Sequence, residues 1–218
     1  ILKYDTDTDA ANVVFPFDNV IEAGEGTVLP GENNELIYAS DGGDYSDDGA
    51  IITIDTVTRE AELIARFNYF PAGFDPGNAL TQTQGNRFFG LTDRGGEFNA
   101  GTLYEYLPNT KEIVGRYHFR DDSLRIYNRY LSEGPNGLLY GLVSYNPPSN
   151  LVSARINPLL AIGGGTTTAT DARYLFSFDP ETLQLDTILN FNTVEGDTPL
   201  ENAGFTLDGD YLYGAVRS

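Results

Sequence analysis

The 218-residue chain has no cysteine, no methionine and no tryptophan, and its only histidine is His118. Without cysteine the chain forms no disulfide and offers no thiol nucleophile or thiolate ligand. One histidine is too few for a transition-metal cluster. The sequence also lacks the G-x-S-x-G pattern of a nucleophile elbow, so no serine is placed there to use His118 as a base. We therefore expect His118 to be structural and predict no catalytic residue.

Basic residues are scarce as well. The chain has 13 Lys and Arg against 32 Asp and Glu, which gives a formal net charge of −19. Nucleic acids and anionic membrane surfaces are recognised by Lys and Arg, so both are excluded as partners. No run approaches 18 apolar residues, and we expect no membrane insertion. The chain starts without Met or a signal-peptide pattern, so we expect a mature chain or a fragment.

The chain is rich in short runs of Val, Ile, Tyr and Phe that are separated by Gly, Pro, Asn and Asp, which is typical of β-strands and turns. The clearest stretch is 87–119, which we interpret as three strands and two turns. Its second hairpin recurs as pairs of residues 13 positions apart, namely Tyr4 and Phe17, Ile54 and Phe67, Tyr106 and Phe119, and Phe178 and Phe191. We expect the phenylalanine that closes each hairpin to pack between neighbouring sheets.

A longer repeat connects these hairpins. Tyr38, Phe89 and Tyr140 are 51 residues apart each time, and Tyr213 follows 73 residues later. A period near 50 residues that is built only of strands predicts propeller blades or a β-solenoid. Each of these aromatics is followed by a small residue, which we expect where packing near a crowded centre excludes bulk: Ala39, Gly90, Gly141 and Gly214.

These repeats predict one all-β domain over residues 1–218, a β-propeller with three complete four-stranded blades at about 25–67, 79–119 and 129–191. Residues 1–17 resemble the second half of a blade and residues 203–218 the first half. We therefore predict a further blade that is split between the N- and C-termini, which leaves no long edge unpaired. The alternative is that the chain is an arc of a larger propeller.

The motif around the second unit resembles the Gloeo/Verruco repeat of exported bacterial proteins. The matching residues are Gly85, Phe89, Gly90, Thr92, Gly95, Gly96, Gly101, Thr102 and Phe119 in that unit, Leu139, Tyr140 and Gly141 in the next, and Leu212, Tyr213 and Gly214 in the last. The first unit departs from the pattern with Ala39 and Ala50, and the third replaces the Gly-Gly loop with a long insert. The resemblance implies a propeller-like protein that is secreted or displayed on the bacterial surface. It implies no catalytic residues.

One acidic loop is a candidate metal site. Asp41, Asp44, Asp47 and Asp48 fall within eight residues on a Gly-containing loop, and Ca²⁺ prefers such oxygen ligands. The alternative interpretation is a solvated loop without metal. The acidic run Asp5–Thr8 aligns with Asp179–Thr182 and 107–110, so we interpret it as a hairpin turn. We predict no cofactor other than calcium at the acidic loop.

The third unit contains a long insert, residues 144–172, rich in Pro, Asn, Gly and Thr. Long loops of this kind are usually functional or disordered. Tyr127 and Tyr145 do not recur in the other units, and we expect Tyr145, Asn146, Asn150 and Arg155 to line a binding face with Tyr127, because such side chains suit a sugar or peptide ligand.

We therefore interpret the chain as an extracellular or cell-surface, non-enzymatic propeller that binds a protein or glycan. A first alternative is a segment of a self-assembling fibre or adhesin, with further copies of the chain as partners. A second is a propeller hydrolase or lactonase that acts on carbohydrate-like substrates.

Overall fold

The structure is a computed structural model that describes residues 1–13, 15, 27–40, 48–77, 80–120, 124–126, 130–145, 172–190, 198–199, 206–208, 211–213 and 216–217. Every regular element in these residues is a β-strand, as the sequence predicts. Within the same ranges, no helix has the length and apolar character needed to cross a membrane.

Four β-hairpins share one local geometry. They are β1–β2 (Leu2–Asp5, Ala10–Val13), β5–β6 (Ala50–Asp55, Ala61–Arg66), β10–β11 (Thr102–Leu107, Glu112–His118) and β15–β16 (Ala172–Asp179, Gln184–Asn190). In three of the turns the first residue is an Asp whose Oδ1 accepts backbone N–H bonds from two and three positions later; these residues are Asp5, Asp55 and Asp179. The predicted hairpin turn at Asp5–Thr8 is confirmed.

A β-bulge marks the same place in each of these hairpins. The pairing shifts by one residue between Ile51 and Ile52, between Leu103 and Tyr104, and between Leu175 and Phe176. In β1–β2, Leu2 pairs with Val13 whereas Ile1 is bonded to Phe15, which is the same shift. The N-terminal hairpin is therefore a true copy of the other three.

Three antiparallel sheets are built on these hairpins. The second strand of each sheet is β4 (Glu35–Ser40), β9 (Phe88–Arg94) or β14 (Leu139–Tyr145), and the innermost is β3 (Val28–Pro30), β8 (Thr81–Gln82) or β13 (Leu131–Glu133). The strand orders are β3-β4-β5-β6, β8-β9-β10-β11 and β13-β14-β15-β16, which we name the first, second and third sheet.

The second and third sheets each have a fifth strand, so the prediction of four strands holds only for the first. The additional strands are β7 (Phe74–Pro76) and β12 (Leu124–Arg125), which pair with the distal ends of β9 and β14. The physical reason is that β8 pairs only with Phe88 and Phe89. The rest of the β9 edge needs partners for its backbone groups, and β7 supplies them.

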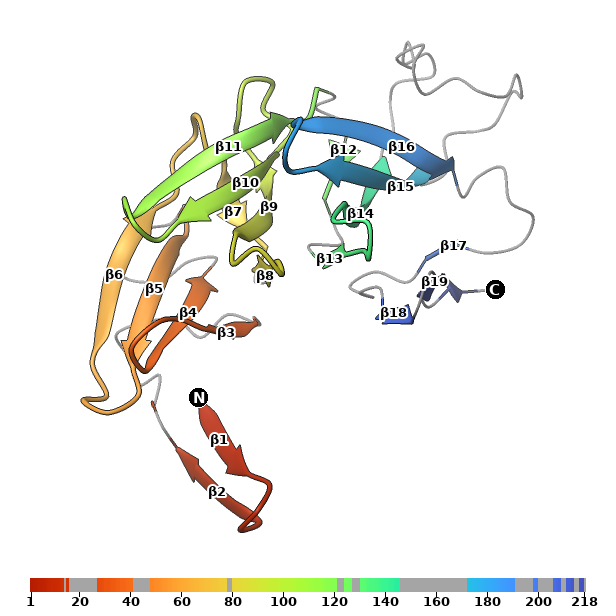
Figure 1. The fold of residues 1–218 in the computed structure, drawn as a ribbon. Helices are drawn as coiled ribbons and strands as arrows, with labels where there is room; N and C mark the ends of the chain where they lie inside the picture. The colour runs from red at the N-terminus through yellow and green to blue at the C-terminus, as the bar shows by residue number, and fades with distance from the viewer. Residues whose placement is uncertain are drawn as a thin grey trace, which may run out of the picture.

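The three sheets follow one another along an open arc, with β6, β11 and β16 on its convex side and β3, β8 and β13 towards its concave side (Figure 1). The hydrophobic core lies mainly between neighbouring sheets. The ring of Phe67 packs against Tyr104 of the second sheet at 4.8 Å, and that of Phe119 packs against Phe176 of the third at 6.0 Å. The predicted role of the closing phenylalanines is thus confirmed for these two, while Phe17 and Phe191 lie outside the described residues. The arrangement is propeller-like.

Glycine in the second strand of a sheet makes room for a ring on the third. Gly90 pairs directly with Tyr104, and a Cβ atom at Gly90 would lie 2.3 Å from the Tyr104 hydroxyl oxygen. Gly141 pairs with Phe176 and would meet its ring at 2.5 Å. In the first sheet the equivalent pair is Tyr38 and Ile52, in which the ring is on the second strand instead. In all three sheets the two paired residues fill the same space. The ring comes from the third strand in the second and third sheets, and from the second strand in the first.

This exchange corrects one part of the predicted repeat. Ile37 pairs with Thr53 as Phe89 pairs with Glu105 and Tyr140 with Ser177, so Ile37 is the counterpart of the two aromatics. The predicted equivalence of Tyr38 with them, and of Ala39 with the two glycines, is wrong by one residue. The spacing misled because Tyr38 fills from β4 the space that Tyr104 and Phe176 fill from the third strand.

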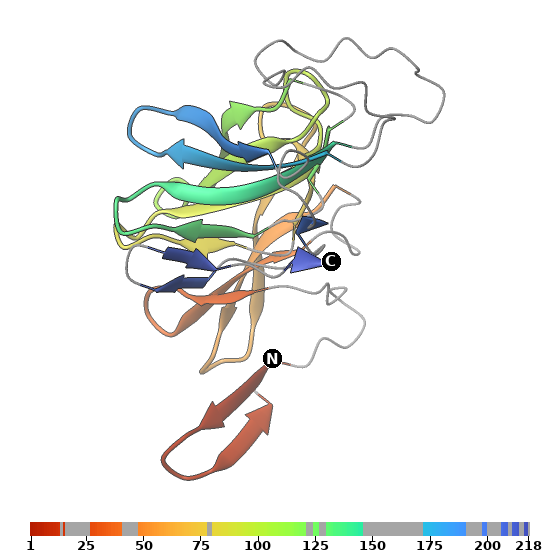
Figure 2. The ribbon, with the colours of Figure 1, turned by 90° about the vertical axis from the view of Figure 1, so that its right-hand side faces the viewer.

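The chain ends form separate two-stranded sheets. These are β1–β2, β18–β19 (Thr206–Asp208, Tyr211–Tyr213) and β17–β20 (Thr198–Pro199, Val216–Arg217). Figures 1 and 2 both show β1–β2 well apart from β18–β19, and no strand pairing joins the two hairpins in the described residues. The predicted split blade, and with it a closed propeller, is not confirmed.

Removing the Tyr104 hydroxyl should stabilise the protein. This oxygen is buried and has no hydrogen-bond partner among the described residues. The equivalent residue of the third sheet is Phe176, so Tyr104→Phe copies a solution that the chain already uses. We expect the free energy of unfolding at pH 7, from urea denaturation, to rise by about 1 kcal/mol because a buried unsatisfied group is removed. A loss of stability would mean that the hydroxyl is hydrogen-bonded in solution.

The same variant should change the stability at high pH. Burial raises the pKa of Tyr104, and burial together with Glu35 and Glu62 raises the pKa of Tyr106 to about 12. An unfolded tyrosine ionises near pH 10, so stability is complete below that value and is lost as the pH rises above it. Tyr104→Phe should therefore lose less stability than the parent between pH 10 and 12.

Candidate functional site

Most residues that the sequence predicts as binding sites fall outside the described part of the chain. Of the proposed ligand-binding set, Tyr145 ends β14, where it pairs with Leu124 and Ala172, while Tyr127, Asn146, Asn150 and Arg155 are not described. Of the proposed calcium ligands only Asp48 is described, and its carbonyl accepts a hydrogen bond from Asp75 N at 3.0 Å. Asp41, Asp44 and Asp47 lie in the undescribed 41–47, so the structure tests neither site.

Among the residues that are described, no three His, Cys, Asp or Glu side chains come together in a way that could hold a metal ion. A candidate site must therefore be sought in other chemistry. Two features of the second sheet stand out: the loops at one end of it, and a cluster of charges at the other.

The loop between β9 and β10, residues 95–101, depends on glycine. Gly95, Gly96 and Gly101 have φ angles of 77°, 76° and 87°. Side chains rarely adopt this left-handed conformation. A Cβ atom at Gly96 would also lie 2.6 Å from the Thr102 methyl group and 2.9 Å from His118 Nδ1. The loop is fixed to the connection between β6 and β7 because Gly96 N donates to Tyr69 O at 2.7 Å.

The hydroxyl groups beneath this loop are used for structure. Thr92 and Thr102 are both fully buried, and their Oγ1 atoms lie 3.0 Å apart. Thr92 Oγ1 also accepts from Thr102 N at 2.9 Å, and Thr102 Oγ1 donates to Ala72 O. Because both hydroxyls are committed to neighbours and shielded from solvent, neither is placed to act as a nucleophile.

His118 ends β11 beside this loop. Its Nδ1 accepts a hydrogen bond from Glu97 N at 3.3 Å, and its ring stacks on Phe70 with 5.9 Å between centroids and 18° between planes. In this geometry Nδ1 is already occupied by a backbone group. The arrangement agrees with the expectation of a structural histidine.

Aromatic side chains are exposed around these fixed elements. Tyr69, Phe70 and Phe98 are 54%, 59% and 36% exposed. Tyr69 stacks on Phe74 at 5.9 Å, and the Arg120 guanidinium lies over the Phe98 ring at 5.4 Å. We name Tyr69, Phe70, Phe98, His118 and Arg120 the aromatic rim. Its ring faces are held by neighbouring side chains and two tethered loops, which is the requirement for stacking against the flat face of a ligand.

The aromatic rim is not among the sites that the sequence predicts. Tyr69 and Phe70 are adjacent aromatics in the segment 68–78, which is otherwise rich in Pro, Gly and Asn. Two consecutive aromatics in a connector, outside any alternating strand pattern, are the signal that would have identified it.

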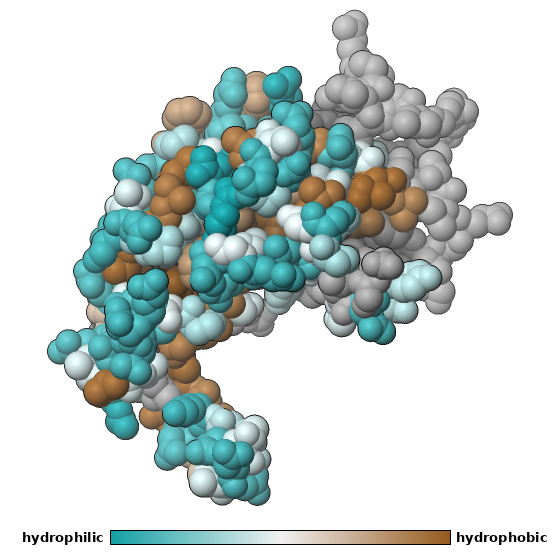
Figure 3. Space-filling view, in the orientation of Figure 1, coloured by the Kyte–Doolittle hydropathy of each residue, from teal (hydrophilic) through white to brown (hydrophobic). Residues whose placement is uncertain are grey.

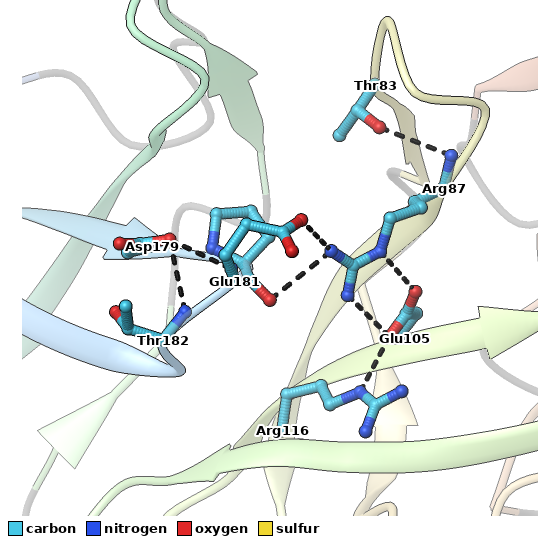
Figure 4. Close-up of polar contacts among 8 residues, drawn as sticks. Thr83, Arg87, Glu105, Arg116, Asp179, Glu181 and Thr182 are labelled. Atoms are coloured by element: carbon cyan, nitrogen blue, oxygen red, sulfur yellow. Dashed lines mark hydrogen bonds and ion pairs between the residues drawn. The ribbon is translucent and has the colours of Figure 1, made fainter.

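The opposite end of the second sheet contains a cluster of four charged side chains (Figure 4). Glu105, on β10, is only 3% exposed and accepts from Arg87 Nε at 2.7 Å and from Arg116 Nε at 2.6 Å. Arg87 also reaches the third sheet, where it bonds Pro180 O at 3.3 Å and Glu181 at 2.9 Å. The buried carboxylate of Glu105 thus holds Arg87, and Arg87 connects the second sheet to the third.

Electrostatics keep the Glu105 carboxyl ionised. Burial is the largest single effect and raises its pKa, but the hydrogen bonds and the positive charges of Arg87 and Arg116 together lower it by more, so the pKa lies below its usual value. Both carboxylate oxygens are engaged, Oε1 by Arg87 and Oε2 by both arginines. A general acid or base needs a raised pKa and a free oxygen, so this cluster has the character of a structural ion pair.

Comparison with known proteins identifies the fold alone. No protein-family model and no curated protein matches the chain, so the Gloeo/Verruco resemblance stays a prediction. Among solved structures, the chain is similar to the extracellular domain of a protein described as a one-component system from B. thetaiotaomicron. The TM-score is 0.50 at 16% identity, and the match covers 99% of this chain and 22% of that one.

Two solved oligogalacturonate lyases also match. The lyase from Vibrio parahaemolyticus has a TM-score of 0.51 at 16% identity, over 87% of this chain and 46% of that one. A lyase in complex with manganese has a TM-score of 0.51 at 14% identity, over 87% of this chain and 47% of that one. The chain thus spans less than half the length of each of these three structures, and its fold is of the same kind as theirs.

Proposed function

We propose that the chain forms part of a non-enzymatic, propeller-like binding module that acts outside the cell and recognises a protein or glycan ligand. The observation that carries this proposal is the aromatic rim. Three aromatic side chains, each with one ring face against a neighbour, are exposed on loops next to a rigid sheet. The hydroxyl and imidazole groups nearby are committed to structural bonds. Such a surface can bind by stacking.

The connection between β14 and β15 of the third sheet supports a binding face at the sheet end where the aromatic rim lies. The insert joins β14 to β15 as residues 95–101 join β9 to β10, so both connections leave their sheets at the same end. The sequence-predicted ligand residues Tyr145, Asn146, Asn150 and Arg155 belong to that connection. We propose that they add to the binding face that the aromatic rim begins. The predicted calcium site at Asp41, Asp44, Asp47 and Asp48 remains part of the proposal.

The location outside the cell rests on two supports. One is the resemblance to an exported repeat, and the other is the extracellular domain among the similar structures. A chain with a net charge of −19 resists non-specific association through self-repulsion, which suits an exposed module.

The proposal predicts that the rim is needed for ligand binding. We would titrate residues 1–218 with a panel of neutral and acidic oligosaccharides by calorimetry, and then test Phe70→Ala and Phe98→Ala against the best binder. Each should weaken binding about tenfold, since an exposed stacking ring is worth about 1.4 kcal/mol. Val57→Ala is the control because Val57 is 71% exposed on a hairpin turn at the opposite end.

Two results would contradict this function. Equal affinity of the parent and both rim variants would mean that the ligand binds elsewhere. Cleavage of oligogalacturonate by the chain, with or without added manganese, would show that it is an enzyme like two of the proteins it is similar to. A loss of binding in Val57→Ala as well would point to general unfolding rather than to the rim.

A further inference from the structure

The hairpins at the two chain ends expose residues that complete sheets bury. Leu2 occupies the position of Ile52, Tyr104 and Phe176, which are almost fully buried, yet Leu2 is 65% exposed. Tyr4 occupies the position of Ile54, Tyr106 and Phe178 and is 55% exposed. Because β1–β2 has the same turn and bulge as the other hairpins, its sequence is adapted to a complete sheet, yet among the described strands β1 pairs only with β2.

The third sheet exposes the face on which a following sheet would pack. Ala65 and Tyr117, next to the bulges of β6 and β11, pack against the core clusters that reach the following sheet. Their counterpart on β16 is Leu189, which is 37% exposed beside Ile188 at 51%. Figure 3 shows a hydrophobic patch over the end of this strand on an otherwise mostly hydrophilic surface. A further sheet therefore fits beside the third.

The free strand edges match each other in kind. In the described residues β19 pairs only with β18, and β1 pairs only with β2. In every complete sheet the corresponding second and third strands pair with each other. The residue after Tyr213 is Gly214, the type that the second and third sheets place opposite Tyr104 and Phe176. Leu2 is the side chain that a complete sheet would place opposite it.

We propose that a second copy of this chain supplies its β1–β2 hairpin to β19, so that Lys3 of one copy pairs with Tyr213 of the other. This register is the one in which Ser177 pairs with Tyr140 and Glu105 with Phe89. The composite sheet places β18–β19 inside and the incoming β1–β2 outside, next to Ile188 and Leu189 of the third sheet. The proposal is independent of the proposed function.

Two facts favour a second copy over the chain's own N-terminal hairpin. The two hairpins stand apart in both views, and Figure 1 shows them at the ends of the open arc (Figures 1 and 2). The chain also covers only 46% and 47% of the oligogalacturonate lyases that share its fold, so its arc corresponds to about half of such a protein. Two arcs exchanging hairpins reciprocally close a ring with one interface used twice.

Disulfide cross-linking tests the register directly because the chain has no cysteine of its own. Lys3→Cys and Tyr213→Cys chains, made separately, mixed and oxidised, should give a covalent heterodimer at least about tenfold more abundant than a mixture of Lys3→Cys with Val57→Cys. Both positions are exposed in the single chain, so neither substitution should impair folding. Tyr4→Cys with Tyr213→Cys should not cross-link, because the two side chains would point to opposite faces.

The chain carrying both Lys3→Cys and Tyr213→Cys separates the remaining outcomes. A cross-linked product of two-chain mass supports the exchange, and light scattering of the unmodified chain should give the same mass. A cross-linked product of single-chain mass would show that the hairpin closes on its own chain and would overturn the proposal. Cross-linking no more frequent than in the Val57→Cys control would overturn the register.

Discussion

Replacing Gly90 by alanine should destabilise the protein by about 3 kcal/mol, measured as the free energy of unfolding in urea. The new Cβ atom would lie 2.3 to 2.7 Å from the hydroxyl, Cζ and Cε1 atoms of Tyr104, which is fully buried between the first and second sheets. No flexible end can move aside, because the ring packs against Phe67 at 4.8 Å. The cost is that of overpacking a filled core.

The controls for Gly90→Ala come from the same chain. A Cβ atom at Gly85 would have no atom nearer than Thr83 Oγ1 at 3.8 Å, so Gly85→Ala should change the free energy of unfolding by less than about 0.5 kcal/mol. It reduces the entropy of the unfolded chain as much as Gly90→Ala does. Combining Gly90→Ala with Tyr104→Ile places an isoleucine opposite position 90, as Ile52 lies opposite Tyr38, and removes the ring that the new Cβ atom would meet. We expect the double variant to be more stable than the sum of the single effects predicts, and strict additivity would refute the clash.

The Gly90–Tyr104 pair and its counterpart Tyr38–Ile52 show how far the sequence could predict the fold. The strands, the turns and the 13-residue hairpin repeat follow from local patterns, because β-branched and aromatic residues and turn formers act within a few positions. Local patterns could not show that the predicted equivalence of Tyr38 with Phe89 is wrong by one residue. It depends on which of two paired strands contributes bulk to a shared space, and that is decided only when the strands pair. The additional strands β7 and β12 likewise arise from edges left open in three dimensions.

The candidate site was harder to predict for a different reason. Sequence patterns draw attention to dense acidic or irregular segments such as 41–48 and 144–172, which are rich in potential ligands. The aromatic rim instead combines Tyr69 and Phe70 from one connection with Phe98 from a loop and His118 from a strand end. The pairing of β7, β9, β10 and β11 and the bond from Gly96 N to Tyr69 O bring them together, and single-sequence spacing does not carry this information.

Replacing Glu105 by alanine should cost about 3 kcal/mol of unfolding free energy at pH 7. The substitution leaves Arg87 and Arg116 at a sheet interface without the carboxylate that both contact, and breaking a buried pair costs about 3–5 kcal/mol. We expect the lower end of this range because the arginine side chains are 29% and 26% exposed and can recover some hydration. Urea denaturation of the purified variant measures the change.

Glu62→Ala is the matched control for Glu105→Ala. Glu62 is also a strand glutamate paired with a cation, Lys111 at 3.3 Å, but it is 67% exposed and its partner 55%. Exposed pairs of this kind contribute about 0–1 kcal/mol, so Glu62→Ala should change the stability little. Equal losses in the two variants would mean that burial and the second arginine add nothing to the Glu105 cluster.

The pH dependence separates the charge of Glu105 from its packing. Because the folded state lowers the pKa of Glu105, its stabilising effect is complete above the unfolded pKa of about 4.3 and is lost as the pH falls through the lower, folded value. Glu105→Gln keeps the shape and removes the charge, so the stability difference between it and the parent should shrink steadily below about pH 4. A difference that stays constant down to pH 2 would mean that the carboxylate acts through packing alone. The interface between the second and third sheets would then owe its stability to Phe89, Phe119 and Phe176.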